Sequence, residues 1–157
     1  MIKNIQVMKI REIKENKKEF LELLLLADEQ EDMIDRYLDE GEMFIMEQNR
    51  QAVSVCVCLP LDHEAGILEI KNLAVHPSFQ RQGSGRQMID FIAEKYRDRY
   101  KVLQVGTGDS PLTIPFYRAC GFRESHRIKD FFTKHYDHPI YEDGVKLTDM
   151  VCLRKSI

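Results

Sequence analysis

One stretch of the sequence, residues 68–96, restricts the fold more than any other. Residues 68–75 form a short apolar run, and Pro77 just beyond it cannot donate to a strand ladder, so the run predicts a buried strand that ends at a turn. Residues 88–96 place apolar side chains at spacings of three and four, the period of one helix face. The stretch therefore predicts a strand, a loop and a helix in succession.

The loop between this strand and this helix carries Gly83 and Gly85. Glycine lets backbone N–H groups approach a ligand without a Cβ in the way, and the start of a helix adds partial positive charge. The combination favours an anion, above all a phosphate or pyrophosphate, although an ordinary helix-entry turn also uses glycines. The third glycine of a dinucleotide motif is missing, and so is the Lys-Ser or Lys-Thr of a nucleoside triphosphate loop, so both nucleotide motifs are disfavoured.

The same residues resemble motif A of the GNAT superfamily, the acyl-CoA-dependent N-acyltransferases. Gln80, Gly83 and Gly85 match its Gln/Arg-x-x-Gly-x-Gly/Ala pattern, after the Leu-Ala-Val-His-Pro of residues 73–77. The Phe-Tyr-x-x-x-Gly-Phe of residues 116–122 matches a second marker of the superfamily. The resemblance implies an α/β fold with a GNAT-like mixed central sheet flanked by helices, and acetyl-CoA as the co-substrate.

The resemblance also implies which residues bind the co-substrate. The backbone N–H groups of the loop and of the first helical turn would hold the CoA pyrophosphate, with the Arg86 side chain as additional charge, and a main-chain N–H near Val75 would donate to the thioester carbonyl. Ser110 stands where many relatives carry an asparagine that faces the cofactor, and Asp109 is an alternative to it. The expected cofactor-binding residues are Leu73, Ala74, Val75, Gln80, Arg81, Gln82, Gly83, Ser84, Gly85, Arg86 and Ser110.

Two residues are candidates for the chemistry. Tyr117 matches the superfamily tyrosine whose phenol hands a proton to the departing thiolate, although an aromatic residue on an amphipathic helix is more often core. Glu69 lies eleven residues before Gln80, where the histone-acetylating branch of the superfamily places its general base. An exposed carboxylate at the strand end, paired with Lys71, is the alternative for Glu69.

Composition limits the remaining possibilities. The chain has 157 residues, of which 43% are hydrophobic, so we expect a single N-acetyltransferase domain over residues 1–157. Its 23 basic and 26 acidic residues form no basic block, so no nucleic-acid or anionic-membrane partner is expected. Four cysteines without a Cys-x-x-Cys pair favour reduced core thiols, and His135 and His138 lie in a turn without a third ligand, so we expect no metal. The first 18 residues lack a signal-peptide core, which favours the cytoplasm.

Local signals predict further elements and their ends. Asn16 and Glu19 have the spacing of a helix capping box, Gly41 suits a left-handed residue after a second helix, and Ser110-Pro111 suits the start of a late helix. The other elements predicted are a strand around residues 5–9, a helix over residues 31–39, and strands over residues 43–46, 52–59, 102–105, 127–133 and 147–153.

The sequence therefore predicts an N-acetyltransferase that moves acetyl directly from acetyl-CoA to a primary amine of a small molecule. The alternative is a non-catalytic CoA-sensing or regulatory module that keeps the fold. Eight carboxylates between residues 28 and 42 favour a cationic amine as acceptor, although charges on an outer helix face commonly serve only solvation. Nothing in the sequence decides the oligomeric state, and a homodimer is compatible with it.

Overall fold

The structure, a computed structural model, describes residues 8–157, which form two compact units. Unit 1 comprises the described residues up to Leu59 together with Asn72–Phe91. Unit 2 comprises Pro60–Lys71 and Ile92–Ile157. Residues 5–7 of the first predicted strand lie outside the described part, and a strand does begin at Met8.

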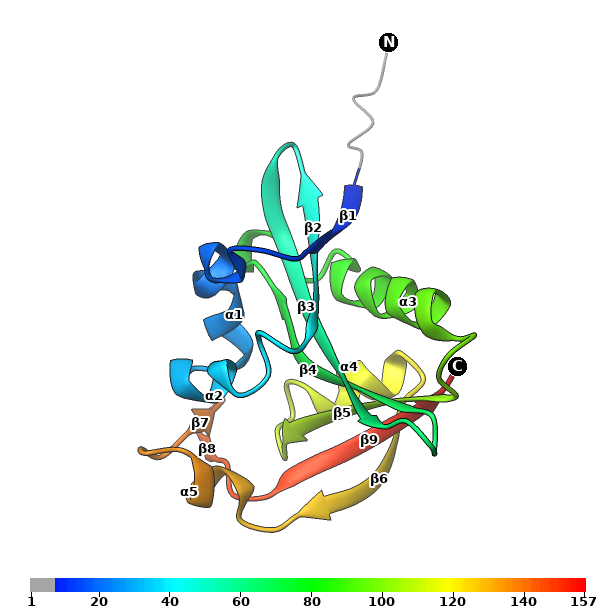
Figure 1. Cartoon of the computed structure of the whole chain (residues 1–157). Helices are drawn as coiled ribbons and strands as arrows, with labels where there is room; N and C mark the ends of the chain where they lie inside the picture. The colour runs from blue at the N-terminus through cyan, green and yellow to red at the C-terminus, as the bar shows by residue number, and fades with distance from the viewer. Residues whose placement is uncertain (1–7) are drawn as a thin grey trace. The chain divides into compact units, whose positions relative to one another are not determined.

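The elements alternate between strands and helices along the chain (Figure 1). The strands are β1 (Met8–Ile13), β2 (Glu42–Gln48), β3 (Gln51–Asp62), β4 (Ile67–Val75), β5 (Val102–Gly108), β6 (Arg123–Ile128), β7 (Tyr141–Glu142), β8 (Val145–Lys146) and β9 (Met150–Ser156). The helices are α1 (Leu21–Ala27), α2 (Glu31–Asp35), α3 (Ser84–Tyr96), α4 (Ile114–Ala119) and α5 (Phe131–His135), with 3-10 helices η1 (Lys17–Phe20) and η2 (Pro77–Phe79).

Seven strands share one sheet in the order β1-β2-β3-β4-β5-β9-β6, and β7 and β8 pair separately. The β4–β5 pair is parallel, whereas β2 pairs with β1 and β3, and β9 with β5 and β6, in antiparallel ladders. This mixed sheet with helices confirms the α/β class expected from the sequence. The boundary between the units falls inside β3 and β4, so both units contain part of each of these strands.

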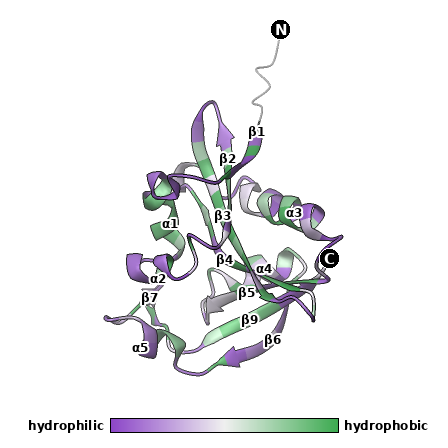
Figure 2. Ribbon diagram, viewed as in Figure 1, coloured by the Kyte–Doolittle hydropathy of each residue, from purple (hydrophilic) through white to green (hydrophobic). Residues whose placement is uncertain are grey.

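In unit 1, β2 and β3 are covered on both faces because successive strand residues point to opposite sides. Ile45 and Val55 pack in a buried cluster with side chains of α1 and α2, whereas Phe44 meets Phe91 of α3 edge to face, with ring centroids 5.5 Å apart. Figure 1 shows α1 and α2 on one side of this hairpin and α3 on the other. Two covered faces explain why residues 43–46 of β2 are all apolar and residues 52–59 of β3 mostly so, and Figure 2 shows β3 largely green.

In unit 2, β5 lies between β4 and β9, and β6 forms the edge of the sheet. All six residues of β6 are exposed, and its register against β9 shifts between Glu124 and His126. A second, smaller cluster buries Phe132, Ile140 and Leu147, which joins α5 to the segment that leads into β9. The segment between α5 and β9 therefore has a small buried cluster and the β7–β8 hairpin.

Two of the predicted helix signals have other roles in the structure. Asn16 adopts a left-handed conformation, with φ of 54°, and its side chain caps no N–H group, so the capping box is wrong and η1 precedes α1. Gly41 is absent from the described residues with positive φ, so the left-handed conformation predicted for it is wrong. A Cβ at Gly41 would lie 2.6 Å from Val57 Cγ1 and 2.7 Å from the Tyr37 carbonyl oxygen, so close packing explains the glycine.

Two boundaries in unit 2 also differ from expectation. Helix α4 begins at Ile114 with Pro115 in its first turn, whereas Ser110-Pro111 lies in the preceding turn. The strand predicted over residues 127–133 begins earlier, at Arg123, and residues 131–133 are helical. The four cysteines are buried free thiols. No helix among residues 8–157 is long and apolar enough to cross a membrane.

Two adjacent lysines of unit 1 differ sharply in what they bind. Helix α2 ends at Asp35, before the end predicted at residue 39, and Lys17 Nζ donates to carbonyl oxygens of the turn that follows it: those of Leu38, Asp39 and Gly41, at 2.8, 3.3 and 2.7 Å. Lys18 Nζ instead forms exposed ion pairs with Glu31 and Asp35. A cation that binds three carbonyls stabilises the turn that contains them, whereas exposed ion pairs contribute little.

We therefore predict that Lys17→Met lowers the free energy of unfolding by about 1–3 kcal/mol, because the carbonyls of this turn lose a charged donor. Lys18→Met is the matched control and should leave the unfolding midpoint nearly unchanged. Equilibrium unfolding in urea measures both variants. Equal losses for the two variants would contradict a stabilising role of the Lys17 hydrogen bonds.

Candidate functional site

In unit 1, the end of β4 is held by two side chains and by a backbone bond to β3. Ser54 Oγ donates to the Ala74 carbonyl oxygen at 2.8 Å, and Gln80 Nε2 donates to that of Val75 at 3.1 Å. The His76 N–H donates to the Val53 carbonyl oxygen at 2.7 Å. These three bonds fix where the strand stops and how the chain enters the following loop.

The loop after β4 makes a compact turn before α3 begins. His76 Nδ1 accepts a hydrogen bond from the Ser78 N–H at 3.1 Å, which opens η2 with Pro77 in its first turn. Arg81 and Gly83 have φ of 62° and 85°, both in the left-handed region. Two left-handed residues turn the chain sharply, so α3 starts directly after Gly83.

Helix α3 begins at Ser84, and the Gln87 N–H donates to the Gly83 carbonyl oxygen at 3.0 Å. An α-helix offers no internal partner for the N–H groups of its first turn, here those of residues 84–86. A Cβ added at Gly83 would meet no heavy atom within 4 Å, so the space beside this glycine is open. Backbone N–H groups at a helix start beside open space form an anion-binding arrangement.

The predicted cofactor residues of unit 1 thus lie together, but not all of them face solvent. Residues 80–83 and Arg86 are exposed, whereas Ser84, Gly85 and Ala74 are buried and Leu73 and Val75 are half-buried. The Gln80 side chain braces the loop by its bond to Val75. Any contact of the buried residues with a ligand would therefore use their backbone.

A buried polar chain in unit 1 was not singled out from the sequence. Asn72 Nδ2 donates to Tyr37 Oη and to the Leu24 carbonyl oxygen, both at 3.0 Å, and Tyr37 Oη donates to Asp28 Oδ2 at 3.2 Å. Burial, followed by the negative charge of Asp28, raises the pKa of the Tyr37 phenol well above its usual value, so the phenol stays a donor. The chain ties β4 to the acidic end of α1.

In unit 2, Glu69 is buried, which differs from the exposed carboxylate considered as an alternative. Its Oε1 accepts a hydrogen bond from Lys71 Nζ at 2.7 Å, and its Oε2 accepts one from Gln104 Nε2 at 2.6 Å. The Glu69 side chain is 12% exposed and that of Lys71 is 34% exposed. The pairing with Lys71 was anticipated, whereas the contribution of Gln104 was not.

Tyr117 lies on α4 in unit 2 and is 7% exposed. Its ring meets those of Phe116 and Phe122 edge to face, with centroids 5.1 and 5.6 Å apart. Its N–H donates to the Thr113 carbonyl oxygen, and its own carbonyl oxygen accepts from the Phe122 N–H, both at 3.0 Å. The Tyr-x-x-x-Gly-Phe spacing therefore ends α4 with a backbone hydrogen bond from Phe122 back to Tyr117. Gly121, with φ of 98°, supplies the left-handed residue after the helix.

Ser110 and Asp109, which stand near the position of the expected asparagine, bind other protein groups. Ser110 is 2% exposed, and its Oγ accepts a hydrogen bond from the Leu112 N–H at 3.1 Å. Asp109 pairs with Arg127 Nη1 at 2.9 Å on the surface of unit 2. Each of these side chains thus orders the turn before α4.

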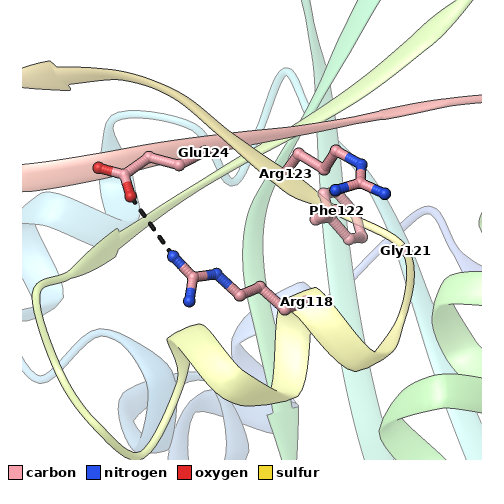
Figure 3. A pocket seen from close by; sticks show the side chains of 5 residues that line it. All are labelled: Arg118, Gly121, Phe122, Arg123 and Glu124. Atoms are coloured by element: carbon pink, nitrogen blue, oxygen red, sulfur yellow. Dashed lines mark ion pairs between the residues drawn. The ribbon is translucent and has the colours of Figure 1, made fainter.

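A hollow of about 440 Å³ in unit 2 is lined by residues outside the predicted site (Figure 3). Its lining residues are Arg118, Gly121, Phe122, Arg123 and Glu124. Arg118 and Glu124 face one another across it, with Nη2 and Oε2 3.7 Å apart. Among residues 8–157, no group of three or more His, Cys, Asp or Glu side chains is arranged to hold a metal ion.

Comparison with known proteins gives a consistent result. Residues 39–124 match the sequence model of the acetyltransferase (GNAT) domain. The N-acetyltransferase YvbK of Bacillus subtilis (strain 168) is 36% identical over 152 residues, which are 96% of this chain and 97% of the relative.

Solved structures agree with this relationship. A GNAT family acetyltransferase from Elizabethkingia anophelis, solved with acetyl-CoA bound, has a TM-score of 0.89 and 35% identity, over 96% of this chain and 98% of that one. A Bacillus subtilis acetyltransferase in complex with CoA has a TM-score of 0.85 and 34% identity, over 96% and 99% of the two chains. From its sequence, its mixed sheet and these relatives, the chain belongs to the GNAT family of acetyltransferases.

Proposed function

We propose that this protein is an acetyl-CoA-dependent N-acetyltransferase that transfers acetyl directly to a primary amine of a small molecule. The observation that carries the proposal is the start of α3, where left-handed Gly83 leaves open space beside the N–H groups of the first helical turn. A pyrophosphate suits such an arrangement. The acetyl-CoA and CoA bound by two relatives of at least 34% identity support the same assignment.

In the proposed reaction, the amine nitrogen attacks the thioester carbonyl, the new C–N bond forms and the C–S bond breaks. An acceptor that arrives as an ammonium ion first releases one proton to solvent, and the neutral amine that attacks then loses one proton to Glu69. The departing thiolate takes one proton from Tyr117, so the products are an amide and free CoA thiol. Solvent then restores both side chains to their starting protonation. A main-chain N–H near Val75 would stabilise the developing oxyanion.

The acceptor is proposed to be a cation, because eight carboxylates lie between residues 28 and 42. We call this set the acidic segment: Asp28, Glu29, Glu31, Asp32, Asp35, Asp39, Glu40 and Glu42. Lys18 pairs with Glu31 and Asp35, which reduces the local negative charge. Basic residues within the segment are still fewer than its carboxylates. A field of one sign raises the local concentration of an oppositely charged substrate.

Gly83→Asp tests the anion site, because it adds a Cβ and a negative charge to the open space. Gly144→Asp is the matched control, since Gly144 also has positive φ, 75°, and no heavy atom within 4 Å of an added Cβ. We predict that Gly83→Asp weakens CoA binding roughly 10-fold or more, about 1.4 kcal/mol, and that Gly144→Asp does not. Titration calorimetry with CoA measures both, and equal affinities would remove the loop from the site.

Tyr117→Phe tests turnover against the non-catalytic alternative. Removal of the phenol should lower the rate constant on the order of 10- to 1000-fold and leave CoA affinity unchanged, because the proton is needed only as the thiolate departs. Tyr100→Phe, at an equally buried tyrosine of unit 2, is the control. The assay is release of free CoA thiol with a panel of primary amines. A wild-type protein that binds CoA but releases no thiol with any amine would favour a regulatory module.

Substitution of Asp32, Asp35 and Asp39 by Asn tests the cationic acceptor. Attraction between exposed charges is screened over roughly 8 Å at physiological ionic strength, so wild-type kcat/KM for a polyamine should fall as salt rises. The triple variant should flatten this dependence. A control triple with the same change in net charge uses three exposed carboxylates elsewhere: Glu64→Gln, Asp98→Asn and Asp143→Asn. A salt response that survives in the first triple variant would leave the acidic segment as solvated surface.

A further inference from the structure

Three polar side chains form a ladder across neighbouring strands of unit 2. Glu69 on β4 is the register partner of Gln104 on β5, and Gln104 is the register partner of Arg154 on β9. Gln104 Nε2 donates to Glu69 Oε2 at 2.6 Å, and Arg154 Nε donates to Gln104 Oε1 at 2.9 Å. Gln104 is 3% exposed, so the middle of the ladder is closed to solvent.

The chemistry of the end members fixes the orientation of the Gln104 amide. A guanidinium can only donate hydrogen bonds, so the amide oxygen has to face Arg154. The amide nitrogen then faces Glu69, whose carboxylate accepts. The amide could otherwise rotate by half a turn and present oxygen to oxygen, which would push the Glu69 carboxylate away. Arg154 therefore determines that the Gln104 NH₂ group, rather than its oxygen, faces Glu69. It does so through Gln104, because the ladder contains no direct bond between Arg154 and Glu69.

The ladder also leaves acceptor positions open on the Glu69 carboxylate. A carboxylate has about four acceptor sites on its two oxygens, and Lys71 and Gln104 use one on each oxygen. Besides Lys71 and Arg154, Cys152 on β9 is a titratable group near Glu69. Burial, and then the negative charge of Glu69, raise the pKa of the Cys152 thiol, so the thiol stays protonated and does not compete for the same proton.

We propose that Gln104 and Arg154 are positioning residues that hold the Glu69 carboxylate in place as the proton acceptor of acetyl transfer. The proposal rests on the role given to Glu69 under the proposed function. Gln104 acts by its hydrogen bond to Glu69, and Arg154 acts only through Gln104. Displacement of a reacting group by about 1 Å can cost on the order of 100-fold in rate. Side chains that hold the Glu69 carboxylate in place therefore affect turnover even though they do not touch the substrate.

The test is a double-mutant cycle with Gln104→Met and Arg154→Met, in which methionine keeps an unbranched side chain without the polar groups. Each single variant should lower kcat roughly 10-fold and leave the affinity for CoA unchanged. If Arg154 acts only through Gln104, the double variant has the kcat of Gln104→Met alone. Arg154→Lys keeps a donor that can reach the amide oxygen and should restore most of the rate. Arg97→Met, at an exposed arginine paired with Glu94, is the control.

A second measurement does not depend on turnover. Nuclear magnetic resonance of the Gln104 side-chain NH₂ group should show slow exchange with solvent in the wild-type protein and faster exchange in Arg154→Met. Additive losses of kcat in the double variant, or unchanged exchange in Arg154→Met, would overturn the positioning role even where wild-type turnover is normal. Absence of wild-type turnover with every amine would overturn the proposed function, and the catalytic part of this inference with it.

Discussion

Backbone carbonyls at the end of β4 have to find donors where the strand stops pairing, and this requirement organises unit 1 around the loop that follows. Ser54 and Gln80 supply those donors from side chains. These bonds order the entry of the loop that carries the left-handed Gly83. Binding to a loop that is already ordered costs less conformational entropy than binding that has to order it.

Much of the fold could be predicted because its elements have distinct periods. The buried helix stripes and the apolar runs of β2, β3 and β4 require no knowledge of distant contacts. Glycine and asparagine signals were harder to interpret, since each residue serves more than one purpose. Gly41 is needed for space beside Val57 and Tyr37, and Asn16 for a left-handed turn, and a single sequence does not separate these roles. β6 was misplaced because both of its faces are exposed, so it shows no alternating pattern.

The candidate site also contains residues that the sequence could predict and residues that it could not. Gly83 and Tyr117 belong to local motifs, which a sequence displays directly. Strand register brings Gln104 to Glu69 across 35 residues and Arg154 to Gln104 across 50 residues. Nothing in the sequence reveals that register. Gln80 and Ser110 show a further limit, because their side chains bond to their own loops and a motif does not distinguish bracing from binding.

The edge strand β6 affects how the sheet can meet other strands. Its six residues include two arginines, a glutamate and a histidine, all exposed, and its ladder is offset at the shift between Glu124 and His126. An incoming strand would have to remove water from these charges and would find an irregular row of backbone groups. β6 therefore ends the growth of the sheet, and it gives a concentrated or partly unfolded population of chains a poor template for stacking strand on strand.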